Sequence, residues 1–490
     1  MVNYNEILET EETLDPSDWE AQRLLAHRMI DDVFSFVSGV REQPAWQPVP
    51  EKVKDLLQAS VPAAPTGDLT SIYERFKKDI LPYRKGSIHP MFFSWVEGNG
   101  TITGVLADML ASTMNSNLAI GDHSAVYVER QVIEWMKQWL GFPATASGIF
   151  TGGGSVANVT ALIVARNAYR DGVAREEGLK HMPEQLVVYC STETHNCVFK
   201  AVETIGIGNR YLRRIPVTAG FTIDMELLRL QLEKDKRAGL TPLCLIGNAG
   251  TVNTGAIDPL EEMAAICRQE SMWFHIDGAI GALAKPVPEM QDAFQAIALA
   301  DSVAFDLHKW MYVNYEAGCL LVRDGIAHKN AFSHPANYLA RHERGLAGGP
   351  ESFSGYGLEL SRSFKSLKIW MGLQEQGMDK YLRLIRQNIA QAFYLQQLVH
   401  ETDTLEMLTP VTLNIVCYRY NPGGQDDDQL NVLNKELLMR LHESGVAAPS
   451  YTILGGRYAI RVSITNHRTT RADLQKLVSH TVLTGKEIMG

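Results

Sequence analysis

The sequence predicts an α/β protein: a mainly parallel central sheet with helices on both faces, followed by a smaller α+β domain. Between residues 89 and 365, short apolar runs typical of buried strands alternate with longer amphipathic segments typical of helices. Parallel strands need a crossover connection, which a helix usually provides. From residue 366 the order changes to long helices and antiparallel-looking strands. We therefore predict a helical arm (1–88), a large domain (89–365) and a small C-terminal domain (366–490).

Composition places the chain among ordinary globular proteins. Its 490 residues are 45% hydrophobic and 21% charged, and the net charge of −10 disfavours nucleic acid as a partner. The acidic start lacks the apolar core of a signal peptide, and no apolar run approaches the roughly 18 residues of a membrane span. Six cysteines form no CxxC pair, so we expect no disulfide framework, no metal site and a reducing, cytoplasmic location.

The first 88 residues are expected to form short helices and connectors. Ser17 is placed to cap a helix that begins near Asp18. Three prolines between residues 43 and 50 exclude a continuous helix there. Because this arm has too little apolar surface to fold alone, we expect it to pack on the main domain or on another subunit.

Helices and strands alternate along the large domain. Amphipathic helices are predicted at Val126–Leu140, stopped by Gly141, and at Ala157–Tyr169. Ligands of such sheets bind beyond the C-terminal ends of the strands, so residues that follow a strand are the first candidates for chemistry. The predicted strands are Gln185–Tyr189, Leu243–Gly247, Trp273–Ile276, Ser302–Phe305 and Cys319–Val322.

The C-terminal region carries the longest helical patterns. We predict helices at Leu367–Leu398 and Leu430–Ser444. Strands are predicted at Leu413–Tyr420 and Arg457–Thr465. This order of elements indicates a small α+β domain.

A run of three glycines follows the apolar pair Ile149-Phe150 and opens the second predicted helix. In Thr151-Gly-Gly-Gly-Ser155, glycines allow the backbone to approach an anion, and the helix start offers free N–H groups. No Gly-Lys-Ser/Thr follows, so this is not a Walker loop. Two interpretations stay open: a phosphate-binding loop and a simple tight turn.

Two candidate residues lie at the ends of consecutive strands. Asp277 ends the strand that begins at Trp273 and could pair with a protonated ring nitrogen, or cap a helix. Lys309, between His308 and Trp310, follows the next strand; burial or a cationic neighbour would lower its pKa and make the amine nucleophilic. A structural salt bridge is the alternative. The separation, 309 − 277 = 32 positions, allows both to face one ligand.

His195 follows the strand Gln185–Tyr189. An imidazole there could stack on a ring and donate a hydrogen bond to a carboxylate. A purely structural histidine is the alternative.

In this order, the four features resemble the group II decarboxylases that depend on pyridoxal 5′-phosphate (PLP), enzymes of the aspartate aminotransferase-like fold, PLP-dependent transferase fold type I. Aromatic-L-amino-acid, histidine and glutamate decarboxylases belong to that group. The resemblance runs from about residue 18 to 475. Further motifs carry it: His89-Pro-x-Phe-Phe93, Leu106-Ala-Asp-Met-Leu110, His308-Lys-Trp310 with Val313-Asn314, and Ser366-Leu-Lys-x-Trp370.

The resemblance implies a role for each candidate. Lys309 would carry PLP as a Schiff base, and Asp277 would pair with the pyridine nitrogen. His195 would stack on one ring face and help to orient the substrate carboxylate, while Ala279 would pack on the other. The residues implied for the phosphate are Gly153, Gly154, Ser155 and His308, with Thr251 as a weaker cofactor ligand.

The resemblance also implies a homodimer with active sites at the subunit interface. In the family, a mobile loop brings a tyrosine from one subunit to the other's site, where it protonates the substrate carbon after CO₂ leaves. Tyr338 lies at the matching distance, 338 − 309 = 29 positions, and the glycine-rich stretch 345–350 after it suits a flexible lid. A tyrosine here favours amine over aldehyde as the product. A surface tyrosine is the alternative.

The segment implied for the substrate pocket predicts an aromatic or bulky apolar amino acid. Trp95 and Val96 suit such a side chain, whereas Glu97 departs from the pattern of aromatic members and could favour a substrate amino group or stay solvated. Arg362 is a further substrate-binding candidate or a structural partner, and Arg461 is expected to form a structural ion pair. Alternatives are an acidic or diamino acid substrate, an aminotransferase or desulfurase of the same fold, and a non-catalytic scaffold.

Overall fold

The computed structural model describes residues 12–334 and 342–490. The chain separates into two compact units, one of residues up to Gln43 with 47–84 and the other of 44–46 with 85–490. Within the described residues, the first unit contains three α-helices, α2 (Trp19–Ser38), α3 (Glu51–Leu56) and α4 (Leu69–Asp79). Asp18, not Ser17, caps α2, because its carboxylate accepts the N–H of Ala21 at 2.9 Å.

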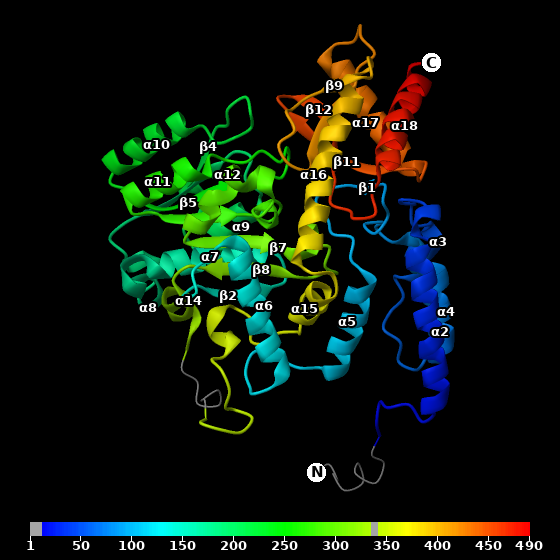
Figure 1. Cartoon of the computed structure of the whole chain (residues 1–490), viewed down its shortest axis with the longest axis horizontal. Helices are drawn as coiled ribbons and strands as arrows, with labels where there is room; N and C mark the ends of the chain where they lie inside the picture. The colour runs from blue at the N-terminus through cyan, green and yellow to red at the C-terminus, as the bar shows by residue number, and fades with distance from the viewer. Residues whose placement is uncertain (1–11, 335–341) are drawn as a thin grey trace. The chain divides into compact units, whose positions relative to one another are not determined.

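A seven-stranded sheet forms the centre of the second unit (Figure 1). Its order is β2-β8-β7-β6-β5-β3-β4, and β8 alone runs antiparallel to its neighbours. The mainly parallel sheet predicted from the alternating pattern is therefore confirmed. The strands are β2 (Ser147–Thr151), β3 (Leu186–Ser191), β4 (Leu212–Ile215), β5 (Thr241–Asn248), β6 (Trp273–Asp277), β7 (Ser302–Asp306) and β8 (Gly318–Val322).

Helices cover both faces of this sheet. Along β6, Phe274 and Ile276 belong to a core shared with α6, α10 and α11, whereas the alternate strand residues pack on the side of α7, α9 and α14. His275 and Asp277 therefore face α7. The helices of this region are α5 (Ile102–Met114), α6 (Ser124–Leu140), α7 (Gly154–Ala168), α8 (Val173–Glu176), α9 (Cys197–Thr204), α10 (Met225–Arg237), α11 (Leu260–Glu270), α12 (Gln291–Phe294), α13 (Leu307–Trp310) and α14 (Gly325–Phe332).

A five-stranded sheet carries the C-terminal part, in the order β1-β11-β12-β10-β9. It is antiparallel except where β1 pairs with β11, so the short strand β1 joins it from far earlier in the chain. The predicted boundary at residue 366 omits this contribution and remains a prediction. The strands are β1 (Phe92–Phe93), β9 (Leu405–Met407), β10 (Ile415–Tyr420), β11 (Ala448–Leu454) and β12 (Arg457–Ser463).

The second sheet is covered by α16 (Met378–His400), α17 (Asp427–Glu443) and α18 (Arg471–Met489), whereas α15 (Ser366–Gln376) packs on α5 and α6. The single helix predicted over Leu367–Leu398 is wrong, because Gly377 at φ +71° separates α15 from α16. None of the helices in the described ranges is both long and apolar enough to cross a membrane.

Candidate active site

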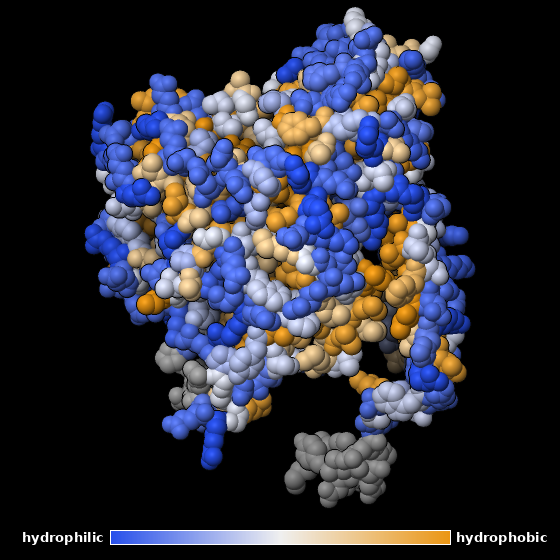
Figure 2. Space-filling model, in the orientation of Figure 1, coloured by the Kyte–Doolittle hydropathy of each residue, from blue (hydrophilic) through white to orange (hydrophobic). Residues whose placement is uncertain are grey.

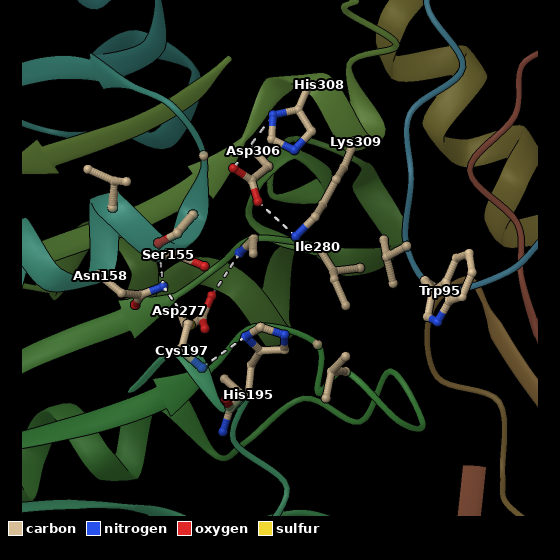
Figure 3. Close-up of a pocket in the computed structure, with 18 of the residues that line it drawn as sticks. Trp95, Ser155, Asn158, His195, Cys197, Asp277, Ile280, Asp306, His308 and Lys309 are labelled. Atoms are coloured by element: carbon tan, nitrogen blue, oxygen red, sulfur yellow. Dashed lines mark hydrogen bonds and ion pairs between the residues drawn. The ribbon is translucent and has the colours of Figure 1, made fainter. Parts of the chain in front are cut away.

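A cavity of about 450 Å³ opens beyond the C-terminal ends of β3, β5, β6 and β7. Side chains from three elements converge on it: Lys309 after β7, Asp277 at the end of β6, and His195 after β3 (Figure 3). Because β6 and β7 are parallel neighbours, the expectation that Asp277 and Lys309 end adjacent strands is confirmed.

Lys309 pairs with an aspartate that the sequence reasoning did not single out. Its Nζ lies 2.7 Å from Oδ2 of Asp306, a residue only 1% exposed. Burial by itself lowers the pKa of the Lys309 amine. The carboxylates of Asp306 and, to a smaller extent, Asp277 raise that pKa, and together they outweigh burial, so the net shift is upward. The expected lowering of the Lys309 pKa is therefore wrong for the cofactor-free chain, because the burial comes with two carboxylates.

Asp277 presents a buried carboxylate to the cavity. Its Oδ1 accepts the N–H of Ala279 at 3.2 Å, and the next regular element is the 3₁₀ turn Ala282–Ala284, so the helix-cap alternative is wrong. Burial raises the pKa of Asp277, while Lys309 and His195 oppose that rise. A buried carboxylate of this kind gains most from a cationic partner, and a protonated pyridine nitrogen supplies one.

The glycine loop (Gly152–Ser155) connects β2 to the first turn of α7 and lines the same cavity. Gly153 has φ +135°, and a Cβ on Gly154 would lie 2.8 Å from Oδ2 of Asp306. Side chains are thus excluded here, and the backbone N–H groups at the start of a 15-residue helix stay accessible. With Lys309 and Asp277, these features suit the phosphate, aldehyde and ring nitrogen of PLP.

Two histidines of the cavity have assignable protons. Nδ1 of His195 accepts the N–H of Cys197 at 3.2 Å, and Nδ1 of His308 accepts that of Ala317 at 3.2 Å. Burial lowers the pKa of both imidazoles, so each is neutral near pH 7 and carries its proton on Nε2. Each ring therefore offers one N–H donor. The His308 ring packs on Tyr315 with centroids 4.5 Å apart.

The rim of the cavity is largely aromatic. Trp95, Tyr315 and Tyr451 line the cavity together with Val96 and Ile280. In Figure 3, Trp95 lies to the right of Lys309. Tyr451 belongs to β11 of the second sheet, which the sequence analysis did not predict.

Glu97 is held away from this rim. Its carboxylate pairs with Lys85, its side chain is only 13% exposed, and it is not among the lining residues. Lys85 Nζ also lies 4.3 Å from the centre of the Trp95 ring. Neither interpretation of Glu97, a partner for a substrate amino group or a solvated loop carboxylate, describes this arrangement.

Arg461 lines the cavity, but its guanidinium donates mainly to backbone carbonyl groups. It donates to the carbonyls of Trp95, Val252 and Asn253 and to the hydroxyl of Ser450. The predicted structural ion pair is wrong: within the described ranges Arg461 has no carboxylate partner. Burial lowers its pKa to about 10. Arg461 instead ties three backbone segments together around the cavity.

Some predicted residues stay outside. Thr251 directs its hydroxyl to Thr254 at 2.9 Å and to the N–H of Ala256, away from the lining. Arg362 pairs with Glu129 at 2.5 Å and does not line the cavity. Tyr338 lies outside the described residues. The other predicted residues, Trp95, Val96, Gly153, Gly154, Ser155, His195, Asp277, Ala279, His308 and Lys309, line the cavity together.

The described residues contain no group of three or more histidine, cysteine or acidic side chains arranged to hold a metal ion. The lining residues that sequence reasoning missed include Asp306, Asn158 and Tyr451. Of these, only Asp306 could have been found from the sequence. It precedes Lys309 by three positions, and residues three apart at a helix start lie on one face.

Comparisons with known proteins agree on one family. A family model described as the pyridoxal-dependent decarboxylase conserved domain matches residues 50–421. The chain is 31% identical over 463 residues to the aromatic-L-amino-acid decarboxylase of Bacillus atrophaeus, with 94% of each chain covered. It is 30% identical over 461 residues to tryptophan decarboxylase 2 of Oryza sativa subsp. japonica, covering 93% of this chain and 92% of that one.

A solved structure extends the likeness to the fold. The tryptophan decarboxylase of Catharanthus roseus in complex with L-tryptophan matches with a TM-score of 0.86 at 25% identity, covering 97% of this chain and 100% of that one. The range matched by the family model contains the whole seven-stranded sheet, whereas β11 and β12 lie beyond it.

Proposed function

Because the chain belongs to the pyridoxal-dependent decarboxylase family, we propose that it removes the α-carboxyl group of an aromatic L-amino acid as CO₂ and releases the amine. The observation that carries the proposal is a single cavity with Lys309 and Asp277 at its floor and aromatic side chains at its rim. The named activities of the relatives from Bacillus atrophaeus and Oryza sativa agree with this substrate class.

The rim supports an aromatic substrate over a charged one. An acidic side chain would need a free cation, but four of the five N–H groups of Arg461 donate to three carbonyl oxygens and the Ser450 hydroxyl, and Lys85 is paired with Glu97. A diamino acid would need a free carboxylate, but Glu97 is paired with Lys85, and Glu316, which lines the cavity, is paired with Lys365 at 3.4 Å. Trp95, Tyr315 and Tyr451 instead offer ring faces and edges to a flat apolar group.

Each of these residues has a separate role in the proposed reaction. Bound PLP supplies an electron sink conjugated to the substrate α-carbon, which accepts the electron pair left when CO₂ departs. Lys309 would hold the cofactor through its Nζ. Asp277 keeps the ring nitrogen protonated, since a buried carboxylate favours the cationic form of its partner.

The glycine loop, Ser155 and the Nε2–H of His308 would hold the phosphate end. His195 would pack on the ring and offer its Nε2–H to the substrate, because its Nδ1 already accepts the Cys197 N–H. Tyr338, which lies outside the described residues, donates the proton to the α-carbon. In this proposal Tyr338→Phe keeps the cofactor and loses amine formation; unchanged amine output without aldehyde would remove Tyr338 from the mechanism.

We further propose a homodimer that works in the cytoplasm. On the single chain, the N-terminal helices expose large apolar side chains that a second copy would cover, among them Trp19, Phe34 and Phe76 (Figure 2). The six cysteines are all free and buried, as expected in a reducing compartment.

A panel of L-amino acids tests the substrate. PLP-loaded protein is assayed for CO₂ release, with the product identified as amine, aldehyde or keto acid. We expect tryptophan, tyrosine or phenylalanine to exceed glutamate and 2,4-diaminobutyrate by at least about 100-fold in kcat/KM. Preferential turnover of an acidic or diamino substrate would overturn the aromatic assignment, and a keto acid product would indicate transamination.

A further inference from the structure

A chain of four hydrogen bonds, three of them buried and the first partly buried, runs beneath the cavity and ends at the glycine loop. Trp273 Nε1 lies 2.8 Å from Ser302 Oγ, which lies 2.8 Å from Nδ1 of His275. Nε2 of His275 lies 2.7 Å from Asn158 Oδ1, and Asn158 Nδ2 lies 2.8 Å from the carbonyl oxygen of Gly154. The chain thus joins β6, β7 and α7.

The partners fix the direction of every bond. The indole Nε1–H can only donate, and the Gly154 carbonyl can only accept. Asn158 must therefore donate through Nδ2 and accept through Oδ1, which places the His275 proton on Nε2. Nδ1 of His275 then accepts the Ser302 hydroxyl proton. All donors point the same way, from Trp273 toward Gly154.

His275 is suited to this position only as a neutral ring. It is 0% exposed, and burial lowers its pKa to about 3. A neutral imidazole has one donor and one acceptor, and the network uses both. Ser302 and Asn158 are buried as well, so water does not compete for these groups.

The network links the two ends of the cavity floor. His275 and Asp277 are two positions apart on β6 and share the face that packs on α7. Asn158 lies one turn after Gly154 in α7, beside Ser155, and itself lines the cavity (Figure 3). Any shift of α7 along β6 would stretch the His275–Asn158 bond. The spacing between the Asp277 carboxylate and the first turn of α7 is held by that bond.

We propose that His275 is a positioning residue, which acts through Asn158 to hold the first turn of α7 at the height that receives the cofactor phosphate while Asp277 receives the ring nitrogen. The inference rests on the proposed function, since it needs phosphate at the glycine loop. His275 itself touches neither cofactor nor substrate. Losing it displaces the phosphate-binding groups without removing any of them.

Comparison of PLP with pyridoxal, which lacks the phosphate, isolates this effect. The affinities of the cofactor-free protein for both compounds are measured by absorbance titration, with the circular dichroism of the bound chromophore as a second readout. His275→Phe keeps the ring volume but loses both bonds, and we expect its PLP-to-pyridoxal affinity ratio to fall by about tenfold. His275→Gln retains an N–H that can reach Asn158 and restores most of the ratio.

His328 provides a matched control. It is also 0% exposed, with Nδ1 at 2.7 Å from Ser147 Oγ and Nε2 at 2.8 Å from the Tyr356 carbonyl, but it does not line the cavity. His328→Phe loses the same kind of bonds and should lose stability without changing the ratio. A fall in the ratio as large as that of His275→Phe would reduce the role of His275 to general stability.

The outcomes separate the inference from its premise. Wild-type protein that binds PLP no better than pyridoxal would overturn the phosphate site itself. Wild-type discrimination that persists in His275→Phe would overturn the positioning role alone. Should His275→Phe fail to fold, Ser302→Ala removes the donor to Nδ1 of His275 together with the acceptor of the Trp273 N–H, and it leaves His275 and Asn158 in place. We then expect about a threefold fall in the ratio; no fall would overturn the proposal.

Discussion

Lys309 pairs with Asp306 and Arg362 pairs with Glu129, and both ion pairs are buried against the seven-stranded sheet. The N–O distances are 2.7 Å and 2.5 Å, and the side chains are 20% and 2% exposed in the first pair, 2% and 0% in the second. Each pair also leaves a buried oxygen without a hydrogen-bond partner among the described residues, Asp306 Oδ1 and Glu129 Oε2. The two pairs are therefore alike in the distance between their charges and in the burial of their carboxylates.

The surroundings separate them. Lys309 and Asp306 border the cavity, where a ligand can replace one partner of the pair. Arg362 donates to the Phe150 carbonyl and lies over the Phe353 ring, and it does not line that cavity. A buried charge with a cavity beside it can change partners during a reaction, whereas a buried charge packed on all sides only stabilises the fold or costs stability.

The largest expected effect is on catalysis, at Lys309. Lys309→Ala removes the amine that holds the cofactor, so decarboxylation should fall by about three orders of magnitude or more. Borohydride reduction followed by peptide mass analysis should find the cofactor mass on the Lys309 peptide of the wild type and none in the variant. Lys329→Ala, which breaks the surface pair with Glu351, serves as the control and should keep both properties.

Arg362 should behave in the opposite way. Arg362→Met leaves Glu129 buried without its partner, so the free energy of unfolding should drop by about 3–5 kcal/mol. The double variant with Glu129→Leu replaces the pair by apolar groups and should recover most of that loss. Urea unfolding measures the stability, and the kcat of folded, PLP-loaded protein should change by less than about twofold. A hundredfold loss of activity in folded Arg362→Met would instead support the sequence-based hypothesis that Arg362 binds substrate.

Substitution of Asp306 tests the ion pair that this residue forms with Lys309 beside the cavity. Because Asp306 raises the pKa of Lys309 more than Asp277 does, Asp306→Asn should lower that pKa. The rate at which cofactor-free protein takes up pyridoxal should then reach its half-maximum at a lower pH. Asp277→Asn is the matched comparison and should give the smaller shift; an equal or reversed order would contradict the assigned pairing.

The sequence could not distinguish these two pairs. Lys309, Asp277 and His195 were predictable because each follows a short apolar run, and in a parallel sheet those ends meet at one edge. Arg362 sits in an irregular segment after no strand, so nothing local says which way it points. Even at Lys309, the sequence suggested burial but not the second carboxylate, and the direction of the pKa shift depends on that carboxylate.

The rim was predictable only in part. Trp95 and Val96 were expected there, but Tyr451 and Arg461 come from strands of the other sheet, more than 100 positions after Lys309. Their approach depends on how the two sheets pack, and periodicity within a segment carries no information about that. Likewise, Gly377 divides a helical pattern that its neighbours continue without interruption, because one residue at positive φ is enough to redirect the chain.

The smallest expected effect is on the pH dependence of stability. It concerns buried histidines that stay neutral, in contrast to the two charged pairs. Burial lowers the pKa of His275 to about 3 and those of His328 and His467 to about 4, from an ordinary value of 6.5. Between pH 6.5 and 4 these histidines bind protons in the unfolded chain but stay neutral in the folded chain, so the free energy of unfolding falls as the pH falls. Each histidine should contribute up to about 1.4 kcal/mol per pH unit. Urea unfolding of His328→Gln at several pH values should give a shallower slope than the wild type, by about one proton, because one of these groups is gone. An unchanged slope would mean that His328 is protonated in the folded chain, and burial alone would then no longer separate neutral histidines from the two charged pairs.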